Sequence, residues 1–284
     1  MNAANGKSEK VIWAIDRSDD QNNDQAGEVA LQIRQMCQQN FEIQPFYVRS
    51  GTKVEDLSRF AEKEGAAFIV ASARESSLID RVGIGSFVEG LVNHATCPLL
   101  VLPVGLSFSA NIFQDHPRVL FATDFSPQSR LSFRAFLALT RHLHLEIKVF
   151  NVATLPATAL ISADGIPTMI PENFFSEELM DARKVAAHWV SLAKNSGVVV
   201  ETEILDGGVG ANISGLVLEA SVRFKAAWIV LSSARGLAGA VLLGSTTREI
   251  LRLSQGPLWL YGPKAHRRSL GVATDSQESP SPTV

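Results

Sequence analysis

The feature that most constrains this sequence is an internal repeat, because a chain that carries similar segments twice in one order is built from two related units. A Gly-Ser pair lies 13 positions before a proline in both halves. Three segments of the first half have counterparts in the second half: KVIWAIDRS (10–18) with RVLFATDFS (118–126), AAFIVASAR (66–74) with AAWIVLSSAR (226–235), and GSFVEGLVNHATCPLLVLP (85–103) with GSTTREILRLSQGPLWLYG (244–262). We therefore infer a duplication.

The two copies differ in length. Asp16 and Asp124 are 108 positions apart, whereas Gly85 and Gly244 are 159 positions apart. The second half therefore has about 51 additional residues, which correspond to the stretch from about Leu145 to Asn195. That stretch contains a strand-like run, a Pro-rich loop and a helical run. We predict that the first half lacks a whole strand–loop–helix unit.

Each half alternates short apolar, β-branched runs with helical patterns, which favours a mainly parallel sheet covered on both faces. The second half is predicted to have five strands and four helices, and the first half about four strands. Ser126 and Pro127 have the residue types that open a helix. In the second half the clearest strands are expected at 118–123, 198–205 and 227–231, and the clearest helices at 127–142 and 213–224.

The last strand of each half, LLVLP (99–103) and LWLYG (258–262), is apolar throughout. An exposed apolar sheet edge invites association, so we expect these two edges to pair with each other. The polar, Pro/Ser-rich end of the chain is predicted to be disordered. The predicted domains are 1–104 (shortened), a linker at 105–117, a full domain at 118–262, and a tail at 263–284.

Composition narrows the class of protein. The chain has 284 residues, 46% of them hydrophobic and 19% charged, with a formal net charge of −3. These values suit globular domains and give no reason to expect nucleic acid or an anionic membrane as a partner. The sequence has no apolar run of the roughly 18 to 20 residues that cross a bilayer. With a polar N-terminus and only Cys37 and Cys97, we expect a cytoplasmic protein.

These landmarks resemble the universal stress protein family, and the resemblance covers nearly the whole chain except its ends. The segment TDFSPQSRLSFRAFLAL is similar to the opening segment of the family, and WIVLSSARG…LLGSTTREILRLSQGPLWLY to its closing segment. The resemblance implies an α/β fold. It consists of two doubly wound, mainly parallel-sheet domains, the first shortened, paired edge to edge as a pseudo-dimer.

The resemblance also implies a nucleotide site. ATP-binding members carry the pattern G-x2-G-x9-G-[ST], which wraps the phosphates and ribose, and an Asp after the first strand. In this chain the pattern departs at its first glycine, which is Ser232 or Ser233, and it is one or two residues shorter before Gly244. We expect ATP with Mg²⁺ to be the ligand if there is one, in the second domain only. The implied residues are Thr123, Asp124, Phe125, Ser126, Val152, Ser232, Ser233, Arg235, Gly236, Gly244, Ser245 and Thr246.

The first half departs further from the pattern. Ser72 and Glu75 occupy its glycine positions, although Gly85 and Ser86 keep the family spacing. A carboxylate about 4 Å from a phosphate costs on the order of 4 kcal/mol at an effective dielectric constant of 20. The missing unit also removes a second strand that would supply part of the adenine pocket. We predict no nucleotide in the first half.

Structural explanations of the same residues stay open. Thr246 with Glu249, and Ser86 with Glu89, have the spacing of a capping box, which would explain the hydroxyls without a ligand. Asp124 could equally cap a helix or a turn. The Pro-rich loop at 153–173 is long enough to be a lid over a ligand.

The sequence thus predicts a non-catalytic stress-response regulator or scaffold that acts on an unidentified protein partner. No catalytic residue or metal ligand is singled out, and an enzymatic role is not expected. Two alternatives remain: a purely structural dimerising module without nucleotide, and a slow ATP-hydrolysing enzyme. Association with a second copy of the chain, as a homodimer, is left open.

Overall fold

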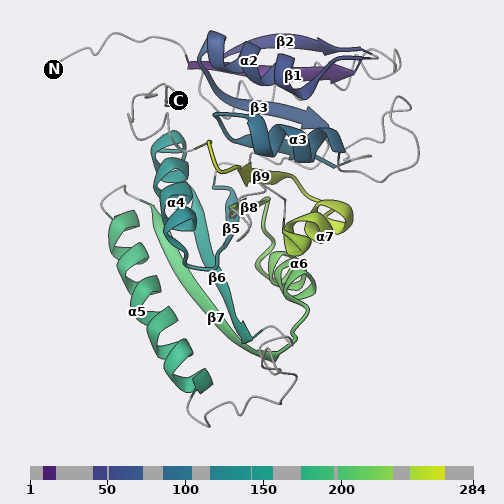
Figure 1. The fold of residues 1–284 in the computed structure, drawn as a ribbon. Coiled ribbons are helices and arrows are strands. Elements are labelled where there is room, and N and C mark those ends of the chain that lie inside the picture. The colour runs from purple at the N-terminus through teal and green to yellow at the C-terminus, as the bar shows by residue number, and fades with distance from the viewer. Residues whose placement is uncertain are drawn as a thin grey trace, which may run out of the picture.

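The structure is a computed structural model in which nine strands form one sheet (Figure 1). It describes residues 9–16, 41–49, 51–72, 86–103, 116–141, 143–155, 174–194, 198–232 and 244–265. The strand order is β2-β1-β3-β4-β9-β8-β5-β6-β7. Neighbouring strands run parallel except for one antiparallel pair at the middle, β4 with β9.

The elements divide between two halves. The first half has β1 (Glu9–Asp16), β2 (Phe41–Val48), α2 (Val54–Glu64), β3 (Ala66–Ser72), α3 (Ser86–His94) and β4 (Leu99–Leu102). The second half has β5 (Arg118–Ala122), α4 (Pro127–Leu139), β6 (Glu146–Leu155), α5 (Phe174–Lys194), β7 (Val199–Val209), α6 (Ile213–Phe224), β8 (Trp228–Ser232), α7 (Ser245–Leu253) and β9 (Leu258–Tyr261). The prediction of five strands and four helices in the second half is confirmed, as are the four strands described in the first.

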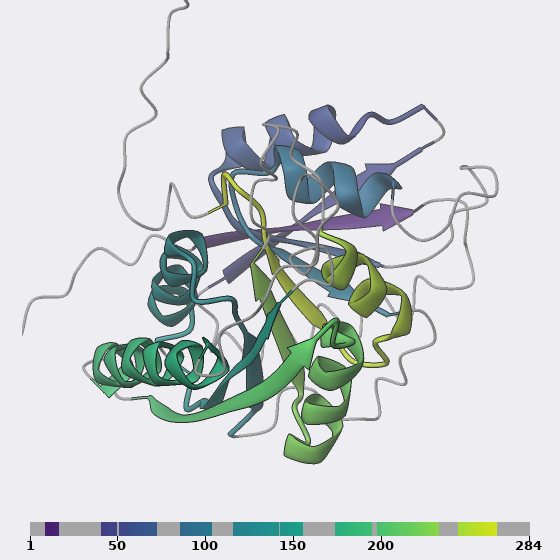
Figure 2. The same cartoon turned by 60° about the horizontal axis from the view of Figure 1, so that its bottom comes forward.

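Helices cover both faces of the sheet (Figures 1 and 2). Leu57 of α2, Leu91 of α3, Val217 of α6 and Ile250 of α7 belong to one buried cluster on one face. The other face carries α4 and α5, whose residues join a second cluster that includes Trp189. Each cluster contains residues of both halves, so the halves share their cores across the sheet.

The β4–β9 pairing confirms the predicted contact between the last strands. Leu99 lies opposite Leu260, Leu100 opposite Trp259, and Val101 opposite Leu258. All of these side chains are buried. The pairing removes two apolar edges that would otherwise promote association with other molecules. The fold is therefore a pair of doubly wound units joined edge to edge, as predicted.

The shortened half is built differently from the expectation that it loses its second strand. β2 pairs in parallel with β1 along its full length, from Glu9 opposite Phe41 to Asp16 opposite Val48. The place beside β1 is therefore filled, as β6 fills the place beside β5. The described strands lack a counterpart of the outermost strand, β7. Burial explains the difference, because an unfilled place beside β1 would expose a central strand, whereas removing an edge strand leaves only a new edge.

The boundaries of local elements follow the residue types. Ser126 caps α4 by accepting a hydrogen bond from the Ser129 N–H, with Pro127 in the first helical position. The predicted helix at 213–224 matches α6. Several predicted boundaries are wrong. The helix predicted at 127–142 ends at Leu139, and the strand predicted at 198–205 continues to Val209. β6 continues to Leu155, into the proposed lid loop, and residues 263–265 form a turn with buried Ala265 rather than the start of a tail. Residues 156–173 and 266–284 lie outside the described ranges.

Gly262, just after β9, approaches the first half closely. A Cβ atom built on Gly262 would lie 1.8 Å from the backbone carbonyl oxygen of Val92, in α3. Backbone atoms of a buried helix cannot move aside as a flexible side chain can. This contact between halves therefore requires glycine.

We expect Gly262→Ala to lower the free energy of unfolding by on the order of 2–3 kcal/mol, because the methyl group overpacks the contact between the halves. Urea denaturation measures the change. Gly256→Ala is the matched control, because its Cβ would meet only the Ala227 carbonyl oxygen, at 3.8 Å. A Gly262→Ala variant as stable as the control would contradict the close approach.

Candidate functional site

Five of the predicted nucleotide residues lie at the carboxyl ends of β5 and β8: Thr123, Asp124, Phe125 and Ser126 follow β5, and Ser232 ends β8. These strands are neighbours, and Ala122 at the end of β5 lies opposite Leu231 in β8. The helices that follow them leave toward opposite faces: α4 packs in one buried cluster and α7 in the other. Such a reversal is the switch point at which open α/β sheets bind ligands.

Asp124 holds the loop between β5 and α4. One carboxylate oxygen, Oδ1, accepts hydrogen bonds from the Ser126 N–H at 2.9 Å and from the buried Ser129 hydroxyl at 2.5 Å. The side chain itself is exposed. Asp124 therefore has the turn-capping contacts that the sequence allows. Its other carboxylate oxygen makes no hydrogen bond within the described part of the chain.

The same loop contains a strained residue. Phe125 has a φ of +55°, a conformation that non-glycine residues rarely adopt. Its N–H donates to the Thr123 hydroxyl at 2.9 Å, and its ring meets Trp189 of α5 edge-on at 5.3 Å between centroids. Asn151 donates to the Thr123 carbonyl oxygen at 2.8 Å. Several contacts thus fix a conformation that the backbone alone disfavours.

Ser232, at the end of β8, contacts α4. Its hydroxyl lies 2.9 Å from the hydroxyl of Ser132, which is fully buried. The bond joins residues on the two sides of the switch point. Ser232 therefore has a structural partner, whatever else it binds. Ser233, Arg235 and Gly236 lie outside the described residues.

Gly244 stands before the first turn of α7. It is the N-cap of that helix and makes no side-chain capping bond, with φ −57° and ψ 153°. Any residue can adopt this conformation. A Cβ at this position would meet no atom within 4 Å in the described structure. Neither the backbone nor the packing of the described residues therefore requires glycine here.

The capping-box interpretation is wrong for α7. α7 begins at Ser245, so Thr246 lies inside the helix, and Glu249 instead accepts a hydrogen bond from the Ser214 hydroxyl of α6. In the first half α3 begins at Ser86, and Glu89 pairs with Arg248. Glu249 and Glu89 thus both interact with residues outside their own helices, and capping does not account for Thr246.

Val152 lies near the carboxyl end of β6, opposite Leu205 of β7. It is half-buried and packs close to Gly207, where an added Cβ would lie 2.6 Å from a Val152 methyl group. The missing side chain of Gly207 therefore leaves room for the Val152 side chain. This places Val152 on the next strand after β5, toward the same edge as Asp124.

Sequence reasoning missed five residues that contact predicted site residues or the helix that follows them: Ser129, Ser132, Asn151, Gly207 and Ser214. One signal was available for two of them. Ser126, Ser129 and Ser132 recur every third residue, which places them along one side of α4. Asn151 is a polar residue between the apolar Phe150 and Val152 of β6, which is a weaker signal.

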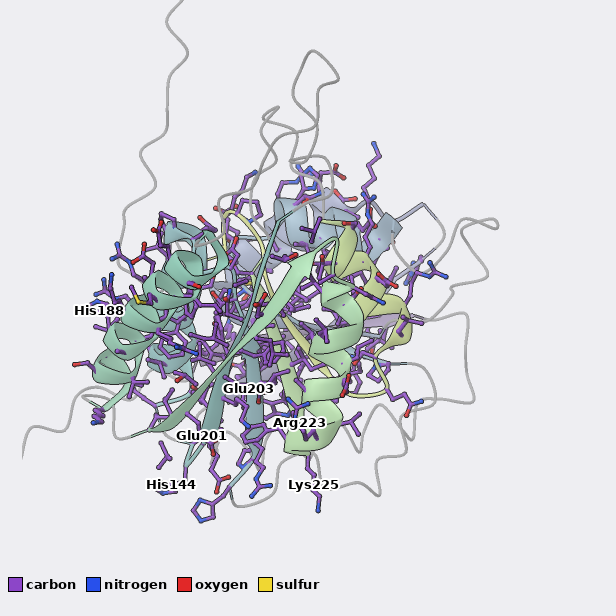
Figure 3. The ribbon with its side chains drawn as sticks, turned by 90° about the horizontal axis from the view of Figure 1, so that it is seen from below. His144, His188, Glu201, Glu203, Arg223 and Lys225 are labelled. Atoms are coloured by element: carbon purple, nitrogen blue, oxygen red, sulfur yellow. The ribbon has the colours of Figure 1, made fainter. Side chains whose placement is uncertain are left out.

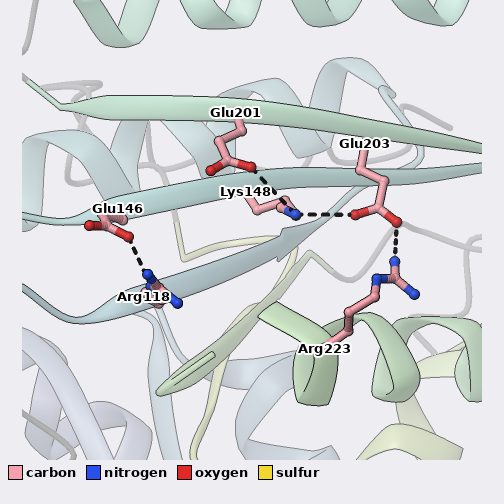
Figure 4. Close-up of polar contacts among 6 residues, drawn as sticks. All are labelled: Arg118, Glu146, Lys148, Glu201, Glu203 and Arg223. Atoms are coloured by element: carbon pink, nitrogen blue, oxygen red, sulfur yellow. Dashed lines mark hydrogen bonds and ion pairs between the residues drawn. The ribbon is translucent and has the colours of Figure 1, made fainter. Parts of the chain in front are cut away.

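A second polar cluster lies at the opposite, amino-terminal edge of the second half (Figures 3 and 4). Lys148 of β6 pairs with Glu201 at 3.4 Å and Glu203 at 3.3 Å, and Arg223 of α6 also contacts Glu203. The Lys148 ammonium group lies 4.6 Å from the centroid of the Phe224 ring. These charges fasten α6 to the sheet, and we assign the cluster a structural role.

A surface cavity of about 280 Å³ lies where the two halves meet. It is lined by residues at the start of β3 and β4, the end of α4, and Ala265. Cys97, one of the lining residues, is buried, as expected for a packing role. None of the predicted site residues lines this cavity.

Within the described ranges, no three His, Cys, Asp or Glu side chains are grouped so that they could hold a metal ion. The described helices include none with the length and apolar character needed to span a bilayer.

Two doubly wound units in one sheet, with a switch point in the complete unit, define a tandem α/β protein. The family model of the universal stress proteins matches the chain twice, over residues 7–103 and 116–262. The chain therefore belongs to the universal stress protein family. No curated protein matches it in sequence.

Solved structures share the fold along nearly the whole chain. A universal stress protein from Archaeoglobus fulgidus DSM 4304 is 18% identical, with a TM-score of 0.51, and the match covers 90% of this chain and 97% of that one. A candidate universal stress protein from Pseudomonas aeruginosa UCBPP-PA14 is 12% identical, with a TM-score of 0.50, covering 93% and 97%. At these identities the comparison concerns the fold alone.

We expect Asp124→Ala to lower the free energy of unfolding by about 1 kcal/mol, because the Ser126 N–H and the buried Ser129 hydroxyl lose their acceptor. Asp124→Asn keeps an Oδ1 acceptor and should unfold close to wild type. Urea denaturation of both variants distinguishes them. Equal stability of the Ala and Asn variants would refute the capping role.

Proposed function

We propose that the chain is a non-catalytic stress-response protein whose second half binds an adenine nucleotide, ATP with Mg²⁺, at the carboxyl ends of β5 and β8. The first half acts as a structural partner without nucleotide. Membership of the universal stress protein family supports the general role. The location of the site rests on the switch point and on the residues gathered there.

Gly244 carries the proposal. A glycine whose φ is ordinary and whose missing side chain leaves open space has no described structural reason to be glycine. A phosphate that approaches the backbone closely supplies a reason, because a Cβ would stand in its way. The absence of a capping side chain on α7 leaves the first-turn N–H groups for such an anion.

Four of the predicted residues have the following roles in this proposal. Backbone N–H groups at Ser245 and Thr246 would hold phosphate oxygens, with the helix terminus adding roughly 0.3–1 kcal/mol per contact. Asp124 would accept from a ribose hydroxyl through the oxygen not used by Ser126 and Ser129. Val152 would offer an apolar surface to the base.

A second function, a structural module without nucleotide, is favoured by a separate observation. Asp124 and Ser232 both have protein partners, and the loop after β5 is held by side-chain hydrogen bonds and aromatic packing. The loop does not need a ligand to keep its shape. In this alternative, Gly244 carries no binding role and the chain acts through protein contacts alone.

Calorimetric titration of nucleotide-stripped protein with ATP and Mg²⁺ tests the proposal. We expect one site per chain with a dissociation constant in the micromolar range, roughly −8 kcal/mol. Gly244→Glu should abolish binding, since a carboxylate near a phosphate costs on the order of 4 kcal/mol. Gly244→Ala should weaken binding about tenfold, equivalent to about 1.4 kcal/mol, without lowering the melting temperature.

Gly256→Ala is the control, because it also adds a methyl group where there is room but lies in the turn before β9. It should bind ATP as wild type does. If wild-type protein gives no heat at millimolar ATP and no rise in melting temperature, the structural module is the better description.

A further inference from the structure

The junction between the halves has an approximate twofold axis that passes through one residue pair. Leu100 of β4 lies directly opposite Trp259 of β9. These two residues are also counterparts in the repeat, 159 positions apart like Gly85 and Gly244. At a twofold axis a residue meets its own counterpart, so two identical halves would place identical side chains there.

The axial residues differ in size. Leu100 and Trp259 are both buried, and the Trp259 ring lies 4.9 Å from Phe68 and 6.1 Å from Trp228 between centroids. Phe68 and Trp228 are themselves counterparts in the repeat. A single large ring on the axis thus packs against the equivalent aromatic residue of each half, and the smaller Leu100 leaves room for it.

A second axial pair lies on the other face of the sheet, where α3 and α7 approach each other. Glu89 Oε1 and Arg248 Nε are 2.8 Å apart. These residues are again 159 positions apart, so they too occupy equivalent positions. One half presents a carboxylate to the axis and the other a guanidinium group.

We propose that these two pairs make each half complementary to the other half and not to itself, so that the edge of β4 is matched to the β9 edge of a second half and not to another β4 edge. Two first halves would bring Glu89 against Glu89 and leave two leucines over a space that Trp259 fills. Two second halves would bring Arg248 against Arg248 and two tryptophans into one place. Both like pairings combine charge repulsion with a misfit in size.

This complementarity limits how the chain associates. A family fold that pairs through its last strand offers that edge to any similar domain, unless the side chains on the axis discriminate. Here β4 pairs with β9 of the same chain, and the side chains on the axis disfavour pairing between two identical halves. A second copy of a chain whose own halves are paired must therefore bind through another surface.

Single substitutions in the full chain reproduce the like contacts. Glu89→Arg creates the contact of two second halves, Arg248→Glu that of two first halves, and the exchange Glu89→Arg/Arg248→Glu restores an opposite pair. We expect each single variant to lower the melting temperature by about 2–4 °C and the exchange to return most of that loss. Leu100→Trp, which places two tryptophans on the axis, should lower it further.

The control is the exposed pair of Asp181 and Lys184 on α5, whose charged atoms are 2.7 Å apart. The charge reversals Asp181→Lys and Lys184→Asp and their combination are compared in the same way. Because both residues lie on one helix, the combination should restore less of the melting temperature than the exchange at the axis does. Recovery at the axis that exceeds the control supports the proposal. Recovery no larger than the control, or a Leu100→Trp variant that melts like wild type, would overturn it.

Discussion

The antiparallel pairing of β4 with β9 is the contact on which the rest of the structure depends. It joins the four strands of the first half and the five strands of the second half into one sheet of nine strands, and it buries both apolar edges. The buried clusters on the two faces run through the junction, so that Leu57 in α2 and Val217 in α6 belong to the same cluster. Stability of either half is therefore linked to the presence of the other. Gly262 allows the close approach of backbone that this arrangement needs.

The two halves have diverged around that junction. The first half dispenses with an outer strand and keeps the strands nearest the axis, because the axis is where its burial is greatest. The second half retains the complete set, with Trp189 of α5 supporting Phe125 in the loop after β5. A loop whose unfavourable φ is held by packing and hydrogen bonds is already ordered, so a ligand would pay little entropy to bind there. The second half has thus kept a preformed loop after β5, and the first half has kept the strands that lie next to the interface.

The candidate site combines residues that serve structure with positions that the described structure does not explain. Asp124 and Ser232 make internal hydrogen bonds that any member of this fold could use for support. Gly244 differs from them, because its conformation and surroundings place no demand on residue type. A residue of that kind is the stronger indicator of a ligand, since support of the fold offers no competing explanation for it.

The sequence by itself determined the duplication, the parallel sheet, the edge-to-edge pairing and the position of helices such as 213–224. The duplication follows from the repeated segments, and the pairing from two apolar last strands that need cover. The sheet and the helices follow from periodicity and turn residues, which act over a few neighbouring residues. Only the tertiary structure decided that β2 fills the place beside β1, that Ser132 meets Ser232, and that Glu89 pairs with Arg248. Those partners are far apart in the chain, and their contact depends on strand register and helix placement. Local sequence pattern cannot specify these contacts, because the partner of a carboxylate comes from a distant segment that only the folded structure brings within hydrogen-bonding distance.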